Sequence, residues 1–182
     1  MRHFGIETMH ALMAFNLQPE RQDLESIHTL KKMLMTNDAI VYETVAHPMN
    51  RIGEANGELV GGNLSVLYSL LGSNSDIDTN GKILFLEDLD EYLYHVDRMM
   101  MALKRTGKLN GLAGLVIGDM SDMRDNAIPF GLNALEIIQS HVKECNYPVC
   151  FGFPAGHEKR NVALRLGAQV KLQVGTKVTL HY

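Results

Sequence analysis

The sequence contains no tryptophan and only two cysteines, Cys145 and Cys150, among 182 residues. Two cysteines five positions apart form neither a CxxC pair nor the framework of a disulfide-rich domain, so we expect two reduced, buried thiols. The first ten residues, MRHFGIETMH, lack the apolar stretch and the cleavage site of a signal peptide. We therefore expect a cytoplasmic protein.

Long apolar runs and clusters of positive charge are also missing. No run reaches the ~18 apolar residues that a membrane span needs. The net charge is −4 and no block of lysine or arginine occurs, which argues against nucleic-acid binding. Neither a membrane nor a nucleic acid is therefore an expected partner.

The common motifs for metal and nucleotide binding are absent as well. Eight histidines and 21 acidic residues would permit a metal site, but the sequence has no HExxH or CxxC spacing. Neither GxGxxG nor GxxxxGK[ST] occurs. We expect no metal and no cofactor.

What the sequence does contain is an alternation of strand-like and helix-like segments. Apolar residues recurring every three or four positions predict helices at 22–35, 64–71, 92–105 and 130–145. Strands are predicted at 39–46, 59–60, 82–86, 111–118 and 148–151, with a terminal hairpin of 168–174 and 177–181. Segment 48–57 and the GDMSD stretch, which starts at Gly118, are predicted to be loops. This order is typical of an α/β domain with additional β-structure at its C-terminal end.

The stretch FGFPAGH, Phe151–His157, is the most informative part of the chain. A β-prone run leads into Gly152, Pro154 and Gly156, and the break ends on His157. Glycine allows close backbone approach and proline fixes φ, so His157 would be held on a stiff loop at a strand end. An α/β fold presents a catalytic base in this way. Taken alone, the stretch also fits a tight turn with a surface histidine.

A histidine base needs a carboxylate that orients its ring. Glu87 is the best-placed candidate because it is the first polar residue after the predicted strand 82–86. Asp88, Asp90 and Glu91 are expected to be N-terminal charges of the following helix. A nucleophile is not found: no GxSxG elbow surrounds any of the serines before Glu87, which are Ser26, Ser65, Ser69, Ser73 and Ser75.

A glycine-rich turn, Gly61-Gly62-Asn63, precedes the predicted helix at 64–71. Backbone N–H groups at such a position can receive an anion or a carbonyl oxygen of a substrate. Alternatively, the glycines allow close packing and Asn63 caps the helix. The residues leave both interpretations open.

Three motifs together resemble the LD-carboxypeptidase family of serine peptidases, which also contains the microcin-immunity peptidases. They are LVGGNLS at 59–65, ILFLED at 83–88, and FPAGH followed by Asn161 at 153–161. The resemblance runs from about Phe4 to the C-terminus. It implies a swivelling β/β/α, barrel-like C-terminal domain at 39–182. Residues 1–38 would be a remnant of, or a link to, a largely absent Rossmann-like domain that carries the nucleophilic serine.

The same resemblance implies a function. Glu87 would act as the acid and His157 as the base, with Gly61, Gly62 and Asn63 close to the substrate. The family hydrolyses the amide to the terminal D-amino acid of a murein tetrapeptide in the cytoplasm, without a metal, and usually as a homodimer.

The sequence departs from the family pattern at three places. The serine of the GxSD elbow has no counterpart, His10-Ala11-Leu12 stands where His-Gly-Pro is usual, and Glu158 follows the histidine where a small residue is common. The resemblance is therefore to the C-terminal part of such an enzyme. The alternative is a non-catalytic dimerisation or peptide-binding module, either a pseudoenzyme or half of a split enzyme.

Overall fold

The computed structural model describes residues 5–18, 20, 23–36 and 38–182. Its main sheet has seven strands in the order β2-β9-β8-β3-β4-β5-β6. These strands are β2 (Val41–Val45), β3 (Gly53–Asn63), β4 (Ile83–Leu89), β5 (Gly114–Ser121), β6 (Val149–Cys150), β8 (Gln169–Val174) and β9 (Lys177–His181). Two further strands, β1 (Thr8–His10) and β7 (Leu164–Leu166), pair with each other.

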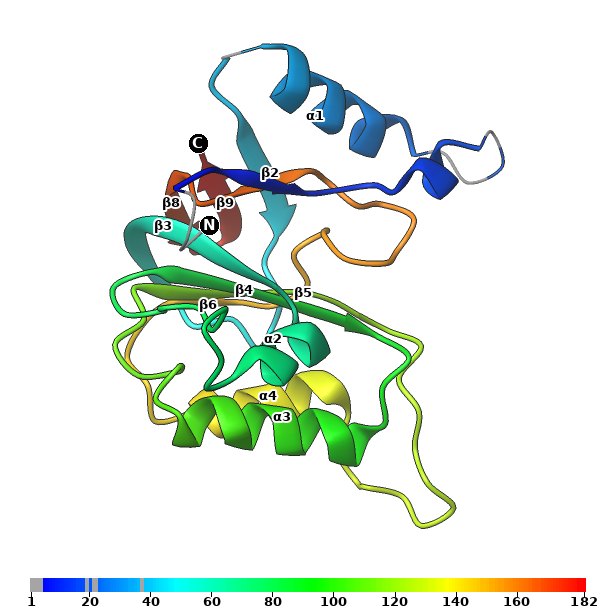
Figure 1. Cartoon of the computed structure of the whole chain (residues 1–182), viewed down its shortest axis with the longest axis vertical. Helices are drawn as coiled ribbons and strands as arrows, with labels where there is room; N and C mark the ends of the chain where they lie inside the picture. The colour runs from blue at the N-terminus through cyan, green and yellow to red at the C-terminus, as the bar shows by residue number, and fades with distance from the viewer. Residues whose placement is uncertain (1–4, 19, 21–22, 37) are drawn as a thin grey trace.

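The helices are α1 (Leu24–Met35), α2 (Leu64–Leu70), α3 (Leu93–Arg105) and α4 (Ala134–Val142), and a short 3-10 helix, η1, spans Ala14–Leu17. Helices α2, α3 and α4 cover one face of the sheet, whereas α1 lies on the other side, beyond β1 and β2 (Figure 1). None of the helices in the described ranges is both long enough and apolar enough to cross a bilayer.

Strand β3 joins two halves of the sheet that differ in direction. Its first half, from Gly53 to Glu58, pairs antiparallel with β8. Its second half, from Leu59 to Asn63, pairs parallel with β4. One hydrophobic core lies between the sheet and helices α2–α4, and a second packs between β3, β8, β9 and the segment at 150–166. The predicted α/β, barrel-like architecture with a terminal hairpin is confirmed.

Three strand predictions ended too early and two loop predictions were partly wrong. The segment predicted as a loop at 48–57 already belongs to β3 from Gly53 onward. Its glycines and asparagine suggested a turn, but Ala55 is buried in the core and the partner strand β8 imposes the extended form. Strands β4 and β5 continue to Leu89 and Ser121, so Glu87 and most of the GDMSD stretch lie within strands.

Helix boundaries follow the capping residues. Helix α4 begins at Ala134, four residues later than predicted, because Asn133 and Glu136 form a capping box. Asp23 caps α1 by accepting a hydrogen bond from the Ser26 N–H at 2.8 Å. The predicted start of this helix at Gln22, its stop at Asn37 and the start of the resemblance at Phe4 lie outside the described residues.

Candidate active site

The structure brings Glu87 and His157 together although they are 70 positions apart in the chain. The His157 Nδ1–H donates to Glu87 Oε2 at 2.7 Å. The Glu87 side chain is 1% exposed, whereas that of His157 is 32% exposed. A buried carboxylate therefore fixes one edge of a ring that is partly open to solvent, which is the arrangement a general base requires.

The loop that carries His157 is held by backbone and side-chain hydrogen bonds. The Phe153 N–H donates to the carbonyl of Ile117 in β5 at 2.9 Å. The Asn161 side chain brackets Gly156: its Nδ2 donates to the Gly156 carbonyl at 2.6 Å, and its Oδ1 accepts from the Gly156 N–H at 3.2 Å. Asn161 is buried. The loop is thus stiff, as the glycine and proline pattern predicted.

Glu87 is held in its ionised form by its neighbours. Burial alone would raise the pKa of Glu87, but the hydrogen bond from His10 and the charges of His157 and His10 outweigh burial. The pKa of Glu87 therefore lies below its ordinary value of 4.5. A charged Glu87 is a strong acceptor for the His157 ring and stabilises an imidazolium if His157 takes a proton.

His10 is a neighbour of the site that was not among the candidate residues predicted from the sequence. Its Nε2 lies 3.4 Å from Glu87 Oε1, and its ring packs edge-on against Phe85 with centroids 5.1 Å apart. Strand β1 brings it there by pairing with β7. No local pattern marks it, and the one available signal was its place where the family has His-Gly-Pro. Within the described residues, no group of three or more metal-ligating side chains is arranged to hold an ion.

Gly61, Gly62 and Asn63 form the end of β3 rather than the predicted turn, and they lie beside the pair because Asn63 is the register partner of Glu87. Asn63 Oδ1 accepts from the Val66 N–H at 3.1 Å and so caps α2. A Cβ on Gly61 would lie 1.9 Å from the Phe85 carbonyl oxygen, whereas one on Gly62 would meet nothing within 4 Å. The packing role of Gly61 and the capping role of Asn63 are confirmed, and the substrate-binding role stays a prediction.

The acidic residues after Glu87 were expected to lie at the N-terminus of the following helix, and two of them have other roles. Asp88 lies inside β4, accepts from the Ser65 N–H at 2.9 Å and from Asn63 Nδ2 at 2.7 Å, and thereby supports the start of α2. The prediction that Asp88 charges the start of α3 was wrong, because Asp88 lies within β4, which continues to Leu89 before the chain turns toward α3. Asp90 instead forms an ion pair with Arg124.

The candidate serines are engaged elsewhere. The hydroxyls of Ser26, Ser65, Ser69 and Ser73 donate to acceptors within three residues of themselves. Within the part of the chain that the structure describes, no serine hydroxyl is hydrogen-bonded to His157. The site therefore presents a carboxylate and an imidazole without a hydrogen-bonded serine hydroxyl from these residues.

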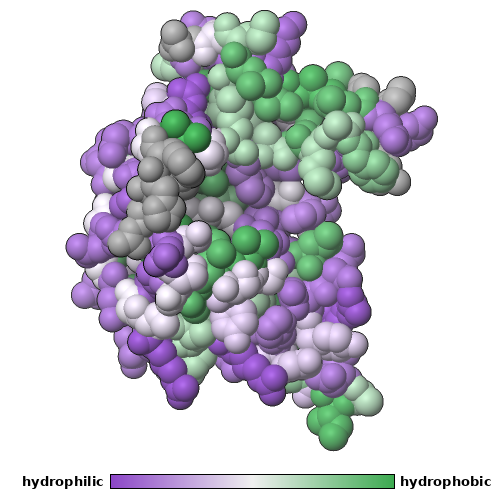
Figure 2. Space-filling model, in the orientation of Figure 1, coloured by the Kyte–Doolittle hydropathy of each residue, from purple (hydrophilic) through white to green (hydrophobic). Residues whose placement is uncertain are grey.

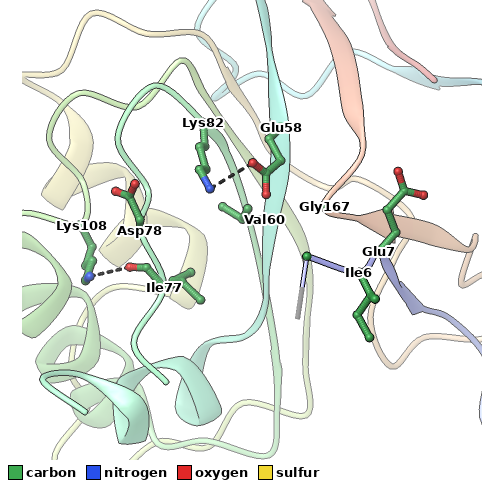
Figure 3. Close-up of a pocket in the computed structure, with 10 residues that line it drawn as sticks. Ile6, Glu7, Glu58, Val60, Ile77, Asp78, Lys82, Lys108 and Gly167 are labelled. Carbon is green, nitrogen blue, oxygen red and sulfur yellow. Dashed lines mark hydrogen bonds and ion pairs between the residues drawn. The ribbon is translucent and has the colours of Figure 1, made fainter. Parts of the chain in front are cut away.

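A pocket of about 670 Å³ is lined by residues that include Glu58, Lys82 and Lys108 (Figure 3). Lys82 directly precedes β4, whereas Glu87 lies near the other end of this strand. The lysines of the pocket are neutralised by neighbours: Lys82 pairs with Glu58 at 3.1 Å, and Lys108 pairs with Asp76 at 3.0 Å. Since both lysines are paired with carboxylates, neither offers an unmatched positive charge to a ligand, and we do not assign the pocket a catalytic role.

Comparison with known proteins places these residues in context. Residues 56–172 match the family model described as "LD-carboxypeptidase C-terminal domain". A probable murein peptide carboxypeptidase of Bacillus subtilis is 34% identical over 167 residues, which cover 86% of this chain and 51% of the relative. A murein tetrapeptide carboxypeptidase of Pseudomonas aeruginosa is 24% identical and is matched over 57% of its length. The chain spans about half the length of the curated relatives it matches.

Solved structures share the fold. The crystal structure of a muramoyltetrapeptide carboxypeptidase from Oxalobacter formigenes superposes with a TM-score of 0.86 at 25% identity, covering 97% of this chain and 61% of that protein. The microcin C7 self-immunity protein in complex with glutamyl sulfamoyl guanosine superposes with a TM-score of 0.81 at 20% identity, again over 97% of this chain and 61% of that protein.

Proposed function

Because this chain belongs to the LD-carboxypeptidase family, we propose that it carries the acid and the base of a serine-type LD-carboxypeptidase. The substrate would be a murein tetrapeptide, and the bond cleaved would be the amide to its terminal D-amino acid. The observation that carries the proposal is the 2.7 Å hydrogen bond between His157 Nδ1 and the buried Glu87. We further propose that the enzyme works in the cytoplasm as a homodimer.

In the proposed reaction, His157 takes the proton of a serine hydroxyl as the serine oxygen attacks the amide carbonyl. The imidazolium then returns this proton to the departing amine of the D-amino acid, and a water molecule releases the peptide from the serine by the same steps. Glu87 holds the ring in one tautomer and stabilises its charge. The serine would come from a Rossmann-like part of the same enzyme, and Gly61, Gly62 and Asn63 would lie along the peptide.

A release assay tests the proposal. The chain is joined to the serine-bearing half of the Bacillus subtilis relative, and release of the D-amino acid from a murein tetrapeptide is followed with D-amino acid oxidase. We expect release by the joined protein and a loss of several orders of magnitude with His157→Ala. His181→Ala, in β9, is the matched control and should retain activity. A joined, folded protein without any release would contradict the proposed function.

The chain alone provides the second arm of this experiment. Without a nucleophile at the site, it should release no D-amino acid above the rate without protein. Release by the chain alone that disappears with His157→Ala would show that a nucleophile exists within these residues.

A non-catalytic binding function is the second candidate, and one observation favours it. Apolar side chains gather on the surface over α1 and the segment before it (Figure 2). They include Met13, Leu24, Leu34 and Met35, each more than half exposed. Patches of this kind mark protein–protein contacts. Sedimentation velocity of the chain and of Leu34→Glu tests this: self-association that the substitution abolishes, together with no D-amino acid release by the joined protein, would support a dimerisation module.

A further inference from the structure

The β5 strand contains an irregularity opposite Glu87. Leu86 pairs with Ile117 and Asp88 pairs with Met120, so Gly118 and Asp119 together face the single residue Glu87. A β-bulge of this kind redirects side chains and is common beside active sites. Gly118 is required there, because a Cβ at this position would lie 2.1 Å from the Ala155 carbonyl oxygen and 3.2 Å from Glu87 Cβ. The bulge thus brings β5 against the loop that carries His157.

Asp119 contacts this loop on both sides of His157. Its N–H donates to the Ala155 carbonyl at 3.0 Å. Its Oδ2 accepts from the Glu158 N–H at 3.2 Å. The close packing extends to Gly156, where a Cβ would lie only 2.8 Å from Asp119 Cβ.

A second hydrogen bond from β5 reaches Glu158. Ser121 Oγ donates to Glu158 Oε1 at 2.7 Å. Glu158 is one of the positions at which the sequence departs from the family pattern, and the structure gives it two hydrogen-bond partners on β5. The backbone is therefore anchored to β5 at Ala155, two residues before His157, and at Glu158, directly after it.

From these contacts we infer that Asp119 is a positioning residue for His157, and that its carboxylate, with Ser121, fixes the His157–Glu158 backbone so that the ring meets Glu87. The catalytic consequence rests on the proposed function, whereas the anchoring itself does not.

The charge of Asp119 makes the anchor sensitive to pH. The pKa of Asp119 is raised to about 6, chiefly by burial and in addition by the charges of Glu158 and Glu87. The hydrogen bond from the Glu158 N–H and the charge of His157 partly oppose this rise. Because a carboxylate accepts a hydrogen bond more strongly than a neutral carboxyl group, the Asp119–Glu158 bond weakens as the pH falls through about 6.

Nuclear magnetic resonance of the chain alone tests the anchoring. The chemical shifts of the Glu158 amide and of the Asp119 side-chain carboxyl are followed between pH 4.5 and 8. We expect both chemical shifts to change with a shared midpoint near pH 6. In Asp119→Asn the change in the Glu158 amide shift at this midpoint should disappear. Asp122→Asn is the matched control, since Asp122 is exposed and three residues further on, and it should leave this change unaltered.

Two results would overturn the inference. One is a Glu158 amide shift that depends on pH in the same way in Asp119→Asn and in the native chain. The other needs no variant: in the native chain, the Asp119 carboxyl shift and the Glu158 amide shift would change with different midpoints.

The catalytic consequence is measured in the joined enzyme. Asp119→Ala should lower kcat by about 10- to 100-fold with KM nearly unchanged, because the base is misplaced while the peptide still binds. Asp119→Asn keeps an acceptor and should restore most of kcat at pH 7. A kcat unaffected by Asp119→Ala would refute the positioning role, whereas an inactive joined enzyme that still shows the shared Glu158 and Asp119 midpoint would refute only the proposed function.

Discussion

Replacing Gly61 by alanine should force β3 away from β4 next to the Glu87–His157 pair. The new Cβ would lie 1.9 Å from the carbonyl oxygen of Phe85 and 2.8 Å from its backbone nitrogen and carbon. These are atoms of the neighbouring strand, so no side-chain rotation can relieve the contact. Either the hydrogen bonds between β3 and β4 lengthen, or the strand shifts in register.

Gly62 provides a matched comparison for the size of this effect. Gly61 and Gly62 have similar backbone angles, with φ of +132° and +137°, but a Cβ on Gly62 meets no atom within 4 Å. Alanine at either position therefore carries the same conformational cost, on the order of 1–3 kcal/mol. Only Gly61→Ala adds overpacking, which reaches about 3 kcal/mol when backbone must move. We expect Gly61→Ala to be about 3 kcal/mol less stable than Gly62→Ala.

Urea denaturation followed by far-ultraviolet circular dichroism measures this difference directly. For a domain of this size, about 3 kcal/mol corresponds to a melting temperature roughly 6–12 °C lower. Unfolding midpoints that coincide for the two variants would refute the close β3–β4 approach at Gly61. If Gly62→Ala lowers the free energy of unfolding by as much as we expect for Gly61→Ala, backbone strain outweighs the contact with Phe85.

Helix α3 could be predicted from the sequence because its buried face is encoded locally. It was predicted at 92–105 and spans Leu93–Arg105, and its buried residues, among them Val96 and Met100, recur at the three- or four-residue spacing on which the prediction rests. The terminal hairpin was predicted within one residue, since β8 and β9 alternate buried and exposed positions around the turn at Gly175. In both cases the signal and the structure occupy the same ten to fifteen residues.

Strand ends could not be predicted in the same way because distant partners define them. The first half of β3 has a composition typical of a turn and becomes a strand by pairing with β8, more than 100 residues later. The end of β5 is polar, and the loop after β6 holds it extended through the hydrogen bond from the Asp119 N–H to Ala155. A polar sequence at the end of a strand carries little local information about its partner.

The residues of the candidate site also fall into two groups, those with a local sequence signal and those without one. Glu87 was found because it directly follows an apolar strand pattern, and His157 because glycine and proline surround it. His10 and Asp119 carry no such mark, and the residues they contact lie 77 and 39 positions away. The sequence therefore predicted the two residues that are the proposed acid and base, and it missed the neighbours that hold them in place.

Two further predictions concern stability at the site. Asn161→Ala removes both bonds to Gly156 and leaves a buried N–H and a carbonyl unpaired, so urea denaturation should show a loss of about 2–4 kcal/mol; the same change at exposed Asn110 should stay within about 0.5 kcal/mol. For Asp119, the folded-state pKa of about 6 lies above the ordinary value of 3.8, so its ionisation opposes folding, and its contribution to stability falls as the pH rises from about 4 to 6. At about 1.36 kcal/mol per pKa unit, the roughly two-unit difference gives an upper bound of about 3 kcal/mol at pH 7. Asp119→Asn removes the cost of ionising this carboxyl group in the folded state. The melting temperature of the variant minus that of the native chain should therefore be larger at pH 7.5 than at pH 4.5. A difference between the two proteins that does not change with pH would mean that Asp119 titrates alike in the folded and unfolded chains, and that burial beside Glu87 does not perturb it.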